Sequence, residues 1–326
     1  MQSEGSDRNA EPLDGVADDT GALQHDHFTG ARGALEQAEE HRFRPPEPEA
    51  RNDVHHAHSA SRILHRGRML SSDFVIGKRE GSNLWWVLRQ KESYLAVLRA
   101  LWILESPFPL IRDEIFSRSL RSATVRVRTP SGPVAIHLNG PVDLSTLFGV
   151  FCRNDYRAGR RLNVAIDIGA NLGIATLYFL TRNANSFVYA YEPVARNVET
   201  FLFNAAPYAG RYELSQTAVG ARSGIVSFGV EPTGKFGGIT APYTERIDVE
   251  CVAINDVLER VLSKHSEIDI LKIDVEGTEQ EIIAAIAPQF WRRIRCVYSE
   301  NSSSAALIPD DFRRTFRYNV ERLQRL

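Results

Sequence analysis

The chain has few cysteines, no long hydrophobic run and no glycine-rich dinucleotide signature. Its three cysteines, Cys152, Cys251 and Cys296, lie far apart without the spacing of a metal site or a disulfide framework, which is typical of a reducing cytoplasm. Nowhere do about 18 apolar residues follow one another, so no membrane span is expected. The amino terminus is acidic and lacks the hydrophobic core of a signal peptide, so we expect a cytoplasmic protein.

Positive charge is also too sparse for a nucleic-acid-binding surface. The 39 Lys and Arg residues nearly balance the 41 Asp and Glu residues, which gives a net charge of -2. Residues 1–60 contain 5 Arg, no Lys and 13 acidic residues, so they carry -8 and the remainder carries +6. Such a mildly basic body is compatible with anionic substrates, but it lacks the dense basic patch that nucleic acids require. No nucleic-acid partner is therefore expected.

Composition and periodicity divide the chain into three parts. Residues 1–60 contain only two aromatic residues and cannot bury enough apolar surface to offset their ordering entropy, so a disordered acidic tail is expected. Three histidines lie near the end of this segment, at positions 55, 56 and 58. No Cys or carboxylate cluster accompanies them, so a solvated tail is favoured over a metal site and no metal is expected. Residues 61–160 are predicted to form a helical and β-hairpin extension, and residues 161–326 an α/β domain.

The extension contains one amphipathic helix and one hairpin. Apolar residues at helical spacing predict a helix near 84–104, which Pro107 ends and whose charged residues exclude a membrane span. It either packs on the main domain or forms a lid or dimer helix over the active site. Strands are predicted at 124–127 and 134–138, and a short helix is expected to begin at Asp143.

From residue 163 onward, strands alternate with helices. Strands are predicted at 163–167, 187–191, 212–219, 268–274 and 295–299, and helices at 174–180, 196–205, 255–264 and after Thr278, where Thr278 and Glu281 would form a capping box. Residues 224–230 and 246–252 read as a further β pair. The alternation predicts a doubly wound, mainly parallel, Rossmann-like sheet.

The stretch N-V-A-I-D-I-G-A-N-L-G at 163–173 predicts a buried strand that ends in a glycine-bearing turn. Such a turn lies at the carboxyl edge of a sheet, where open α/β folds bind ligands. The fingerprint G-x-G-x-x-G is absent, and Asp167 stands where its first glycine would be and would repel a pyrophosphate. A carboxylate there suits a ligand with an ammonium or hydroxyl groups, such as the amino-acid end of S-adenosylmethionine. Asp167 would bind the ammonium directly or hold the loop through hydrogen bonds.

Two more acidic motifs follow at predicted strand ends. Glu192 ends the second strand, 23 residues after Gly169, near the offset at which an acidic residue receives ribose hydroxyls in nucleoside-binding folds. The alternative is a solvent-facing acid. In L-K-I-D-V-E-G-T-E at 271–279, strand alternation places Lys272 and Asp274 on one face at the mouth of the sheet. That arrangement predicts either a reaction site or a buried Lys–Asp pair that fixes the turn.

These three motifs, in this order and spacing, resemble the FkbM family of S-adenosylmethionine-dependent methyltransferases. They are D-I-G-A-N-L-G at 167–173, Y-E-P at 191–193 and L-K-I-D-V-E-G-T-E at 271–279, and the likeness extends over about residues 125–297. The resemblance implies a Rossmann-like methyltransferase sheet and S-adenosylmethionine as the cofactor. It also implies a small-molecule or glycan acceptor that is methylated on a hydroxyl group, often on a sugar or a secondary-metabolite scaffold.

The resemblance further implies roles for individual residues. The cofactor-binding residues would be Asp167, Gly169, Ala170, Asn171 and Gly173 around the methionine part, Glu192 on the ribose, and Thr217 and Ala218 near the adenine. Asp274 would lie next to the reacting methyl group. We hypothesise that Asp274 accepts the acceptor's proton or orients the acceptor, that Lys272 tunes it, and that Glu276 or Glu300 assists.

Two alternative functions remain open, and the C-terminal end of the sequence differs from the usual family pattern. A binding protein that retains the cofactor site without transfer would show the same motifs, whereas a nicotinamide oxidoreductase is disfavoured by Asp167 and the missing glycine. The family fold normally finishes with an antiparallel strand pair. Here a helix at 310–316 and one strand at 318–323 are predicted, so the last strand is expected to be short or missing. The sequence specifies neither the acceptor nor an oligomeric state.

Overall fold

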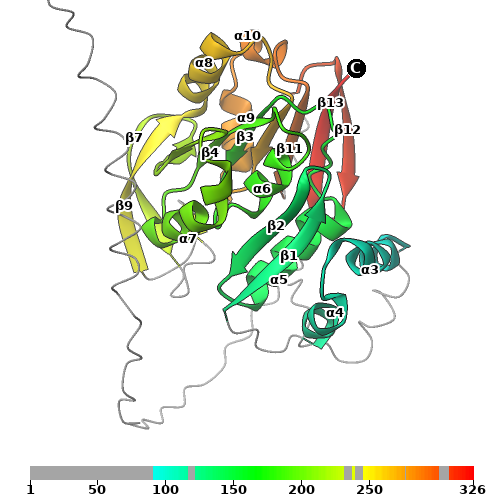
Figure 1. The fold of residues 1–326 in the computed structure, drawn as a ribbon. Helices are drawn as coiled ribbons and strands as arrows, with labels where there is room; N and C mark the ends of the chain where they lie inside the picture. Colours follow the sequence, from blue (N-terminus) through cyan, green and yellow to red (C-terminus); the bar gives the residue numbers. More distant parts are fainter. Residues whose placement is uncertain (1–90, 117–121, 231–236, 239–244, 276, 301–307) are drawn as a thin grey trace, which may run out of the picture. The chain divides into compact units, whose positions relative to one another are not determined.

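The computed structural model describes residues 91–116, 122–230, 237–238, 245–275, 277–300 and 308–326 (Figure 1). The predicted acidic tail at 1–60, with the histidines near its end, lies outside the described residues. Within the described residues, no helix is both long and apolar enough to traverse a lipid bilayer.

A seven-stranded sheet forms the centre, in the order β12-β13-β11-β10-β3-β4-β5. Its strands are β3 (Val164–Ile168), β4 (Phe187–Tyr191), β5 (Tyr212–Ser215), β10 (Ile270–Ile273), β11 (Cys296–Glu300), β12 (Phe312–Arg317) and β13 (Val320–Arg325). The five strands from β11 to β5 are parallel, while β13 runs antiparallel to β11 and β12 antiparallel to β13. The prediction of a doubly wound, mainly parallel sheet is confirmed.

Helices cover both faces of this sheet because successive strand residues point to opposite sides. Ala165 belongs to a core that includes α6, whereas Ile166 belongs to a second core with α8 and α9. The helices are α6 (Ile174–Leu180), α7 (Ala195–Ala205), η2 (Ala206–Tyr208), α8 (Ile254–Lys264), α9 (Glu279–Ala285) and α10 (Pro288–Trp291). Every residue of β3 is buried, as expected for a central parallel strand.

The segment before β3 contains more helix than predicted. Its elements are α3 (Lys91–Ile103), α4 (Pro107–Phe116), β1 (Ala123–Thr129), β2 (Gly132–Leu138), α5 (Pro141–Leu147) and the π-helix η1 (Phe148–Arg153). The predicted hairpin is confirmed as β1 and β2. α3 ends at Ile103, four residues before Pro107, and Pro107 begins α4, because the first helical turn needs no N–H from its proline. Asp143 lies inside α5 rather than at its cap, and its Oδ2 accepts a hydrogen bond from Asn139 N at 2.7 Å.

The predicted strand at 212–219 is in fact two strands in different sheets. β5 ends at Ser215, and β6 (Ala218–Gly220) belongs to a four-stranded sheet with β7 (Gly224–Val230), β8 (Gly237–Gly238) and β9 (Glu245–Ala253). The β pair predicted around 224–252 is confirmed as β7 and β9. The break at 216–217 brings Thr217 to the junction of the two sheets.

The expectation of a helix at 310–316 is wrong. Those residues lie mainly in β12, which pairs with β13 through the two-residue turn Tyr318–Asn319, so both strands of the antiparallel pair are present with six residues each. Phe312 and Phe316 are four positions apart, a spacing that fits one face of a helix and equally one face of a strand.

The capping box predicted for Thr278 and Glu281 is not formed, and the helix predicted at 255–264 begins one residue earlier. Thr278 precedes α9 without a side-chain capping bond. Ala253 rather than Asn255 precedes α8, and the Asn255 amide instead donates to Ala285 O and accepts from Ala287 N. Asn255 therefore connects α8 to the segment that follows α9.

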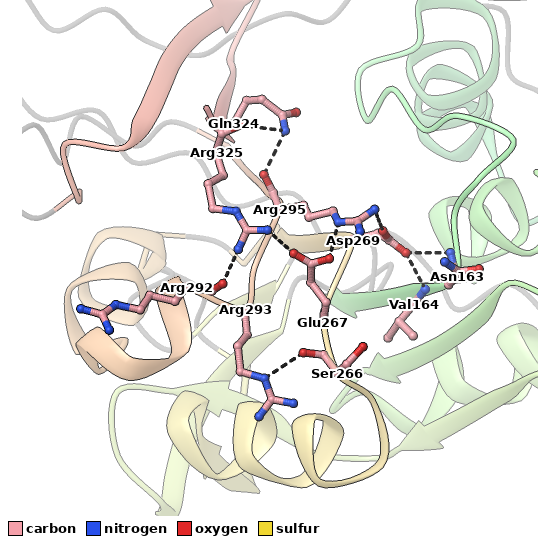
Figure 2. A network of polar contacts seen from close by, with 10 residues as sticks. All are labelled: Asn163, Val164, Ser266, Glu267, Asp269, Arg292, Arg293, Arg295, Gln324 and Arg325. Carbon is pink, nitrogen blue, oxygen red and sulfur yellow. Dashed lines mark hydrogen bonds and ion pairs between the residues drawn. The ribbon is translucent and has the colours of Figure 1, made fainter.

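A polar network holds the amino-terminal edge of the sheet together (Figure 2). Asp269, before β10, accepts hydrogen bonds from the backbone N–H groups of residues 163–164 at 2.7 and 3.0 Å. Glu267 forms ion pairs with Arg295, before β11, and with Arg325, at the end of β13. Because these side chains fasten four neighbouring strands at one edge, the opposite edge is where side chains remain available for a site.

Candidate active site

The loop after β3 has a backbone that only glycine tolerates at two positions. Gly169 has φ +74, and a Cβ added there would lie 1.9 Å from Asp274 O. Gly173 has φ +83, and a Cβ there would lie 2.9 Å from the ring of Phe201. The loop therefore packs against the segment after β10 on one side and against α7 on the other, a close approach that side chains would prevent.

Glu192 fixes this loop to the end of β4. Its Oε2 accepts a hydrogen bond from Asn171 N at 2.9 Å, and its Oε1 accepts from Val194 N at 3.0 Å and from Asn197 Nδ2 at 3.1 Å. The side chain is 5% exposed, so the alternative of a solvent-facing acid is wrong. Burial raises the pKa of Glu192, although these donors act in the opposite direction.

Asp167 and Lys272 form a buried ion pair between neighbouring strands. They are register partners on β3 and β10, and Lys272 Nζ lies 2.9 Å from Asp167 Oδ1. The other carboxylate oxygen of Asp167 accepts a hydrogen bond from Thr176 Oγ1 at 2.7 Å. Lys272 Nζ also donates to the carbonyls of Ile168 and Gly169, at 3.3 and 3.0 Å. The pair thus ties the end of β3 and the start of the glycine loop to β10.

Of the two roles predicted for Asp167, its environment supports holding the loop. The side chain is 0% exposed and already faces an ammonium, so it offers no surface to a ligand. The charge argument against a pyrophosphate also weakens, because Lys272 neutralises Asp167. Burial alone would lower the pKa of Lys272, but the carboxylates of Asp167 and Asp274 outweigh that effect and raise it. Lys272 therefore remains a cation.

Asp274 lies where β10 ends and is partly open to solvent. Its side chain is 35% exposed, and its Oδ2 lies 3.3 Å from Lys272 Nζ. Tyr156, in the segment before β3, places its hydroxyl 3.0 Å from the same Oδ2 and 3.0 Å from Glu300 Oε1 at the end of β11. Burial and the charges of Asp274 and Glu300 raise the pKa of Tyr156 well above its usual value, so it is a neutral phenol. Two carboxylates, a lysine and a tyrosine thus meet at one edge of the sheet.

The β12–β13 turn reaches the same cluster. Asn319 Nδ2 donates a hydrogen bond to Glu300 Oε2 at 2.9 Å. Tyr318 has φ 56, an unusual conformation for a bulky residue, and the guanidinium of Arg153 lies 4.5 Å from the centre of its ring. Strained backbone of this kind is concentrated at functional sites.

Comparison with known proteins supports the family resemblance. The family model described as the methyltransferase FkbM domain matches residues 167–319, which include the glycine loop, Glu192 and the Lys272–Asp274 segment. A relative from Streptomyces tacrolimicus, 31-O-demethyl-FK506 methyltransferase FkbM, is 28% identical over 211 residues, or 53% of this chain and 80% of the relative. Methyltransferase sdnD from Sordaria araneosa is 24% identical over 181 residues, or 44% of this chain and 68% of the relative.

Residues 167–319 therefore match the FkbM methyltransferase family. The resemblance predicted from the three motifs is thereby confirmed, and the nicotinamide oxidoreductase alternative loses its support.

Solved structures of methyltransferases match this chain at low similarity. The putative methyltransferase yhhF from Escherichia coli is 14% identical, covers 62% of this chain and 98% of its own, and has a TM-score of 0.34. A putative methyltransferase from Streptococcus mutans, in complex with SAH, is 9% identical, covers 50% and 89%, and has a TM-score of 0.30. TM-scores this low establish no shared fold, so the fold assignment rests on the strand order of the sheet itself.

The structure of this methyltransferase brings together most of the predicted site residues. Gly169, Ala170, Asn171 and Gly173 form the loop, and Glu192 bonds to that loop directly. Thr217 lies between β5 and β6, and Ala218, which is buried, is the first residue of β6. Glu276 lies outside the described residues. In the described part of the chain, no group of three or more His, Cys, Asp or Glu residues could hold a metal ion.

Tyr156 is the site residue that the sequence patterns missed. Its only signal in the sequence is its position within the family-like stretch 125–297, shortly before the first predicted strand of the α/β domain. Nothing in that segment indicates that its hydroxyl meets two carboxylates from strands more than 100 residues away.

Proposed function

We propose that the protein is an S-adenosylmethionine-dependent O-methyltransferase that acts on a hydroxyl group of a small-molecule or glycan acceptor. The observation that carries the proposal is Asp274, a partly exposed carboxylate next to the glycine loop, fixed by Lys272 and Tyr156. The name of the Streptomyces relative, which gives 31-O-demethyl-FK506 as its substrate, supports oxygen as the acceptor atom.

The residues present fit a nucleoside-bearing cofactor. A carboxylate has about four acceptor positions, and Glu192 uses three of them within the described protein, which leaves one on Oε2 for a ribose hydroxyl. Thr217 Oγ1 is buried without a hydrogen-bond partner among the described residues, so it is available to a polar edge of an adenine. Backbone N–H groups at the start of α6 suit a carboxylate.

When bound, S-adenosylmethionine supplies a sulfonium methyl group: its carbon–sulfur bond breaks as the carbon–oxygen bond to the acceptor forms, and the hydroxyl proton needs a base. Asp274 is suited to accept that proton. Its Oδ2 is occupied by Tyr156 and Lys272, whereas its Oδ1 has no hydrogen-bond partner in the described part of the chain. Because Asp274 is 35% exposed, the proton can then pass to solvent. Lys272, which is 2% exposed, acts through Asp274 as a fixed positive charge.

The test compares Asp274→Asn with Asp248→Asn, an exposed aspartate on β9. With a tritiated methyl donor and candidate glycans or lysate fractions as acceptors, Asp274→Asn should lower kcat by about 100-fold or more, because general bases contribute that much. Affinity for S-adenosylhomocysteine, measured by calorimetry, should stay unchanged in both variants, and Asp248→Asn should keep full turnover. Full turnover by Asp274→Asn would remove the assigned role. Cofactor binding by the wild type without transfer to any acceptor would favour the binding-protein alternative.

A further inference from the structure

The hydroxyl of Tyr156 faces two carboxylates at once. It lies 3.0 Å from Asp274 Oδ2 and 3.0 Å from Glu300 Oε1, and the tyrosine is 4% exposed. A phenol carries one proton and can donate it to one carboxylate at a time. The second contact is a hydrogen bond only when the other carboxyl group supplies a proton of its own. Both contacts are therefore full hydrogen bonds when one of the two carboxyl groups is protonated.

The surroundings of the two carboxyl groups determine which of them holds this proton. Asp274 Oδ2 has the ammonium of Lys272 at 3.3 Å, so a negative charge on Asp274 has a partner. Glu300 has no ion pair among the described residues, and Asn319 donates to its Oε2. Its Oε1 is then the oxygen that carries the proton toward Tyr156. Burial and the negative charge of Asp274 raise the pKa of Glu300 to about 8, which agrees with this assignment.

Charged and titratable groups face Glu300 from several directions. They are Asp274 and Lys272 from the end of β10, Asp155, Tyr156 and Arg153 from the segment before β3, and the amide of Asn319 from the β12–β13 turn. Arg153 is bound to Asp155, with Nε 2.7 Å from Asp155 Oδ1, so its charge is largely matched there. Among the negative charges around Glu300, that of Asp274 has the largest effect on its pKa.

The backbone before β3 sets the position of Tyr156. The π-helix η1 ends at Arg153, the next residue Asn154 has φ 58, and Asp155 N donates back to Gly149 O at 3.1 Å. These features reverse the chain directly before the tyrosine. Its ring then packs edge-on against Tyr298, at 5.8 Å between centroids, so the hydroxyl is held in place. π-Helical turns of this kind are frequent at functional sites.

We propose that Tyr156 is a positioning residue of the transfer reaction: a protonated Glu300 donates to the Tyr156 oxygen, and Tyr156 donates to Oδ2 of an anionic Asp274, which leaves Oδ1 directed at the acceptor hydroxyl. This inference rests on the role proposed for Asp274. It assigns to Glu300 the neutral form in the working enzyme, and not the role of a second base. When Glu300 ionises, it competes for the single proton of Tyr156, and Asp274 loses its fixed orientation.

Glu300→Gln tests the assignment, because an amide imitates the neutral carboxyl group and can donate to the Tyr156 oxygen. The full chain is assayed between pH 6.5 and 9.5. We expect wild-type kcat to fall above about pH 8, whereas the kcat of Glu300→Gln should show no such fall between pH 7 and pH 9.5. Tyr156→Phe keeps the ring and should lower kcat by about 10- to 100-fold at unchanged KM for the cofactor, the effect of losing one hydrogen bond to a charged group. A Glu300→Gln variant as slow at pH 7 as Asp274→Asn would overturn the proposal, because Glu300 would then be needed as an anion.

A spectroscopic readout separates this inference from the proposed function. The infrared band of a protonated carboxyl group should be present at pH 6.5, decline with a midpoint near pH 8 in the wild type, and be reduced in Glu300→Gln at all pH values. If the wild type and Glu300→Gln give the same band at pH 6.5, Glu300 is already ionised and the inference is wrong. The measurement needs no acceptor, so an enzyme that transfers no methyl group in any assay leaves this result readable.

Discussion

Replacement of the buried Lys272 should destabilise the fold far more than replacement of Lys264, an exposed lysine with a shorter ion pair. Lys272 Nζ lies 2.9 Å from Asp167 Oδ1 and 3.3 Å from Asp274 Oδ2, and its side chain is 2% exposed. At an effective dielectric constant of about 20, each attraction is worth roughly 5 kcal/mol before desolvation is subtracted. Lys272→Met leaves the carboxylate of Asp167 buried without its cation. Breaking a buried pair in this way costs about 3–5 kcal/mol.

The matched control is Lys264→Met. Lys264 Nζ lies 2.6 Å from Glu213 Oε1, but the lysine side chain is 49% exposed. Exposed pairs contribute about 0–1 kcal/mol, because water screens the charges and both side chains lose conformational freedom. Distance alone would rank this pair as the stronger, whereas burial ranks it as the weaker.

Urea unfolding followed by circular dichroism measures both variants. Lys272→Met should lower the free energy of unfolding by about 3–5 kcal/mol at an unchanged m value, and Lys264→Met by less than about 1 kcal/mol. The double variant Asp167→Asn/Lys272→Met removes both charges and should recover part of the loss. If Lys272→Met costs no more than Lys264→Met, the uncompensated-charge argument is refuted.

Two further predictions concern the glycine loop and its carboxylate. Glu192→Gln replaces an acceptor oxygen with an amide donor that faces backbone N–H groups, so the affinity for S-adenosylhomocysteine in calorimetry should fall by about 10- to 100-fold, while Glu199→Gln on the exposed face of α7 should leave it unchanged. Equal affinities for the two variants would contradict the ribose assignment. Gly169→Ala brings a methyl group to within 1.9 Å of Asp274 O at φ +74 and should cost more than about 1–3 kcal/mol in thermal unfolding. Gly132→Ala, at φ +112 with no atom within 4 Å, carries the backbone strain alone and should cost less.

Local patterns were enough to predict the loop and the strand ends. The buried run that becomes β3, the glycines at 169 and 173, and Glu192 after β4 are all read from residues that are neighbours in the sequence. The Lys272–Asp167 pair was not predicted as such, because it depends on β10 lying directly beside β3 in a register that pairs these two residues. Strand order is a property of the whole sheet, and periodicity within one segment does not contain it.

The helix predicted at 310–316 failed for a related reason. A spacing of four between Phe312 and Phe316 does not distinguish a helix from a strand, and partner strands decide the matter. β13 provides that partner only because a two-residue turn at Tyr318 reverses the chain in a conformation that bulky residues rarely adopt. Turn chemistry gave no signal there, since neither residue of the turn is a glycine.

The distance along the chain between Tyr156 and Glu300, which are 144 positions apart, sets an order of events during synthesis. A ribosome that has completed β10 has already made the glycine loop, Glu192 and the Lys272–Asp167 pair. Glu300 follows with β11, and Asn319, which holds its carboxyl group, is added only with the β12–β13 turn. The part of the protein that would hold the methyl donor is therefore complete while the part that would position the base is still being made. A nascent chain would gain cofactor affinity before it gains the means to use it.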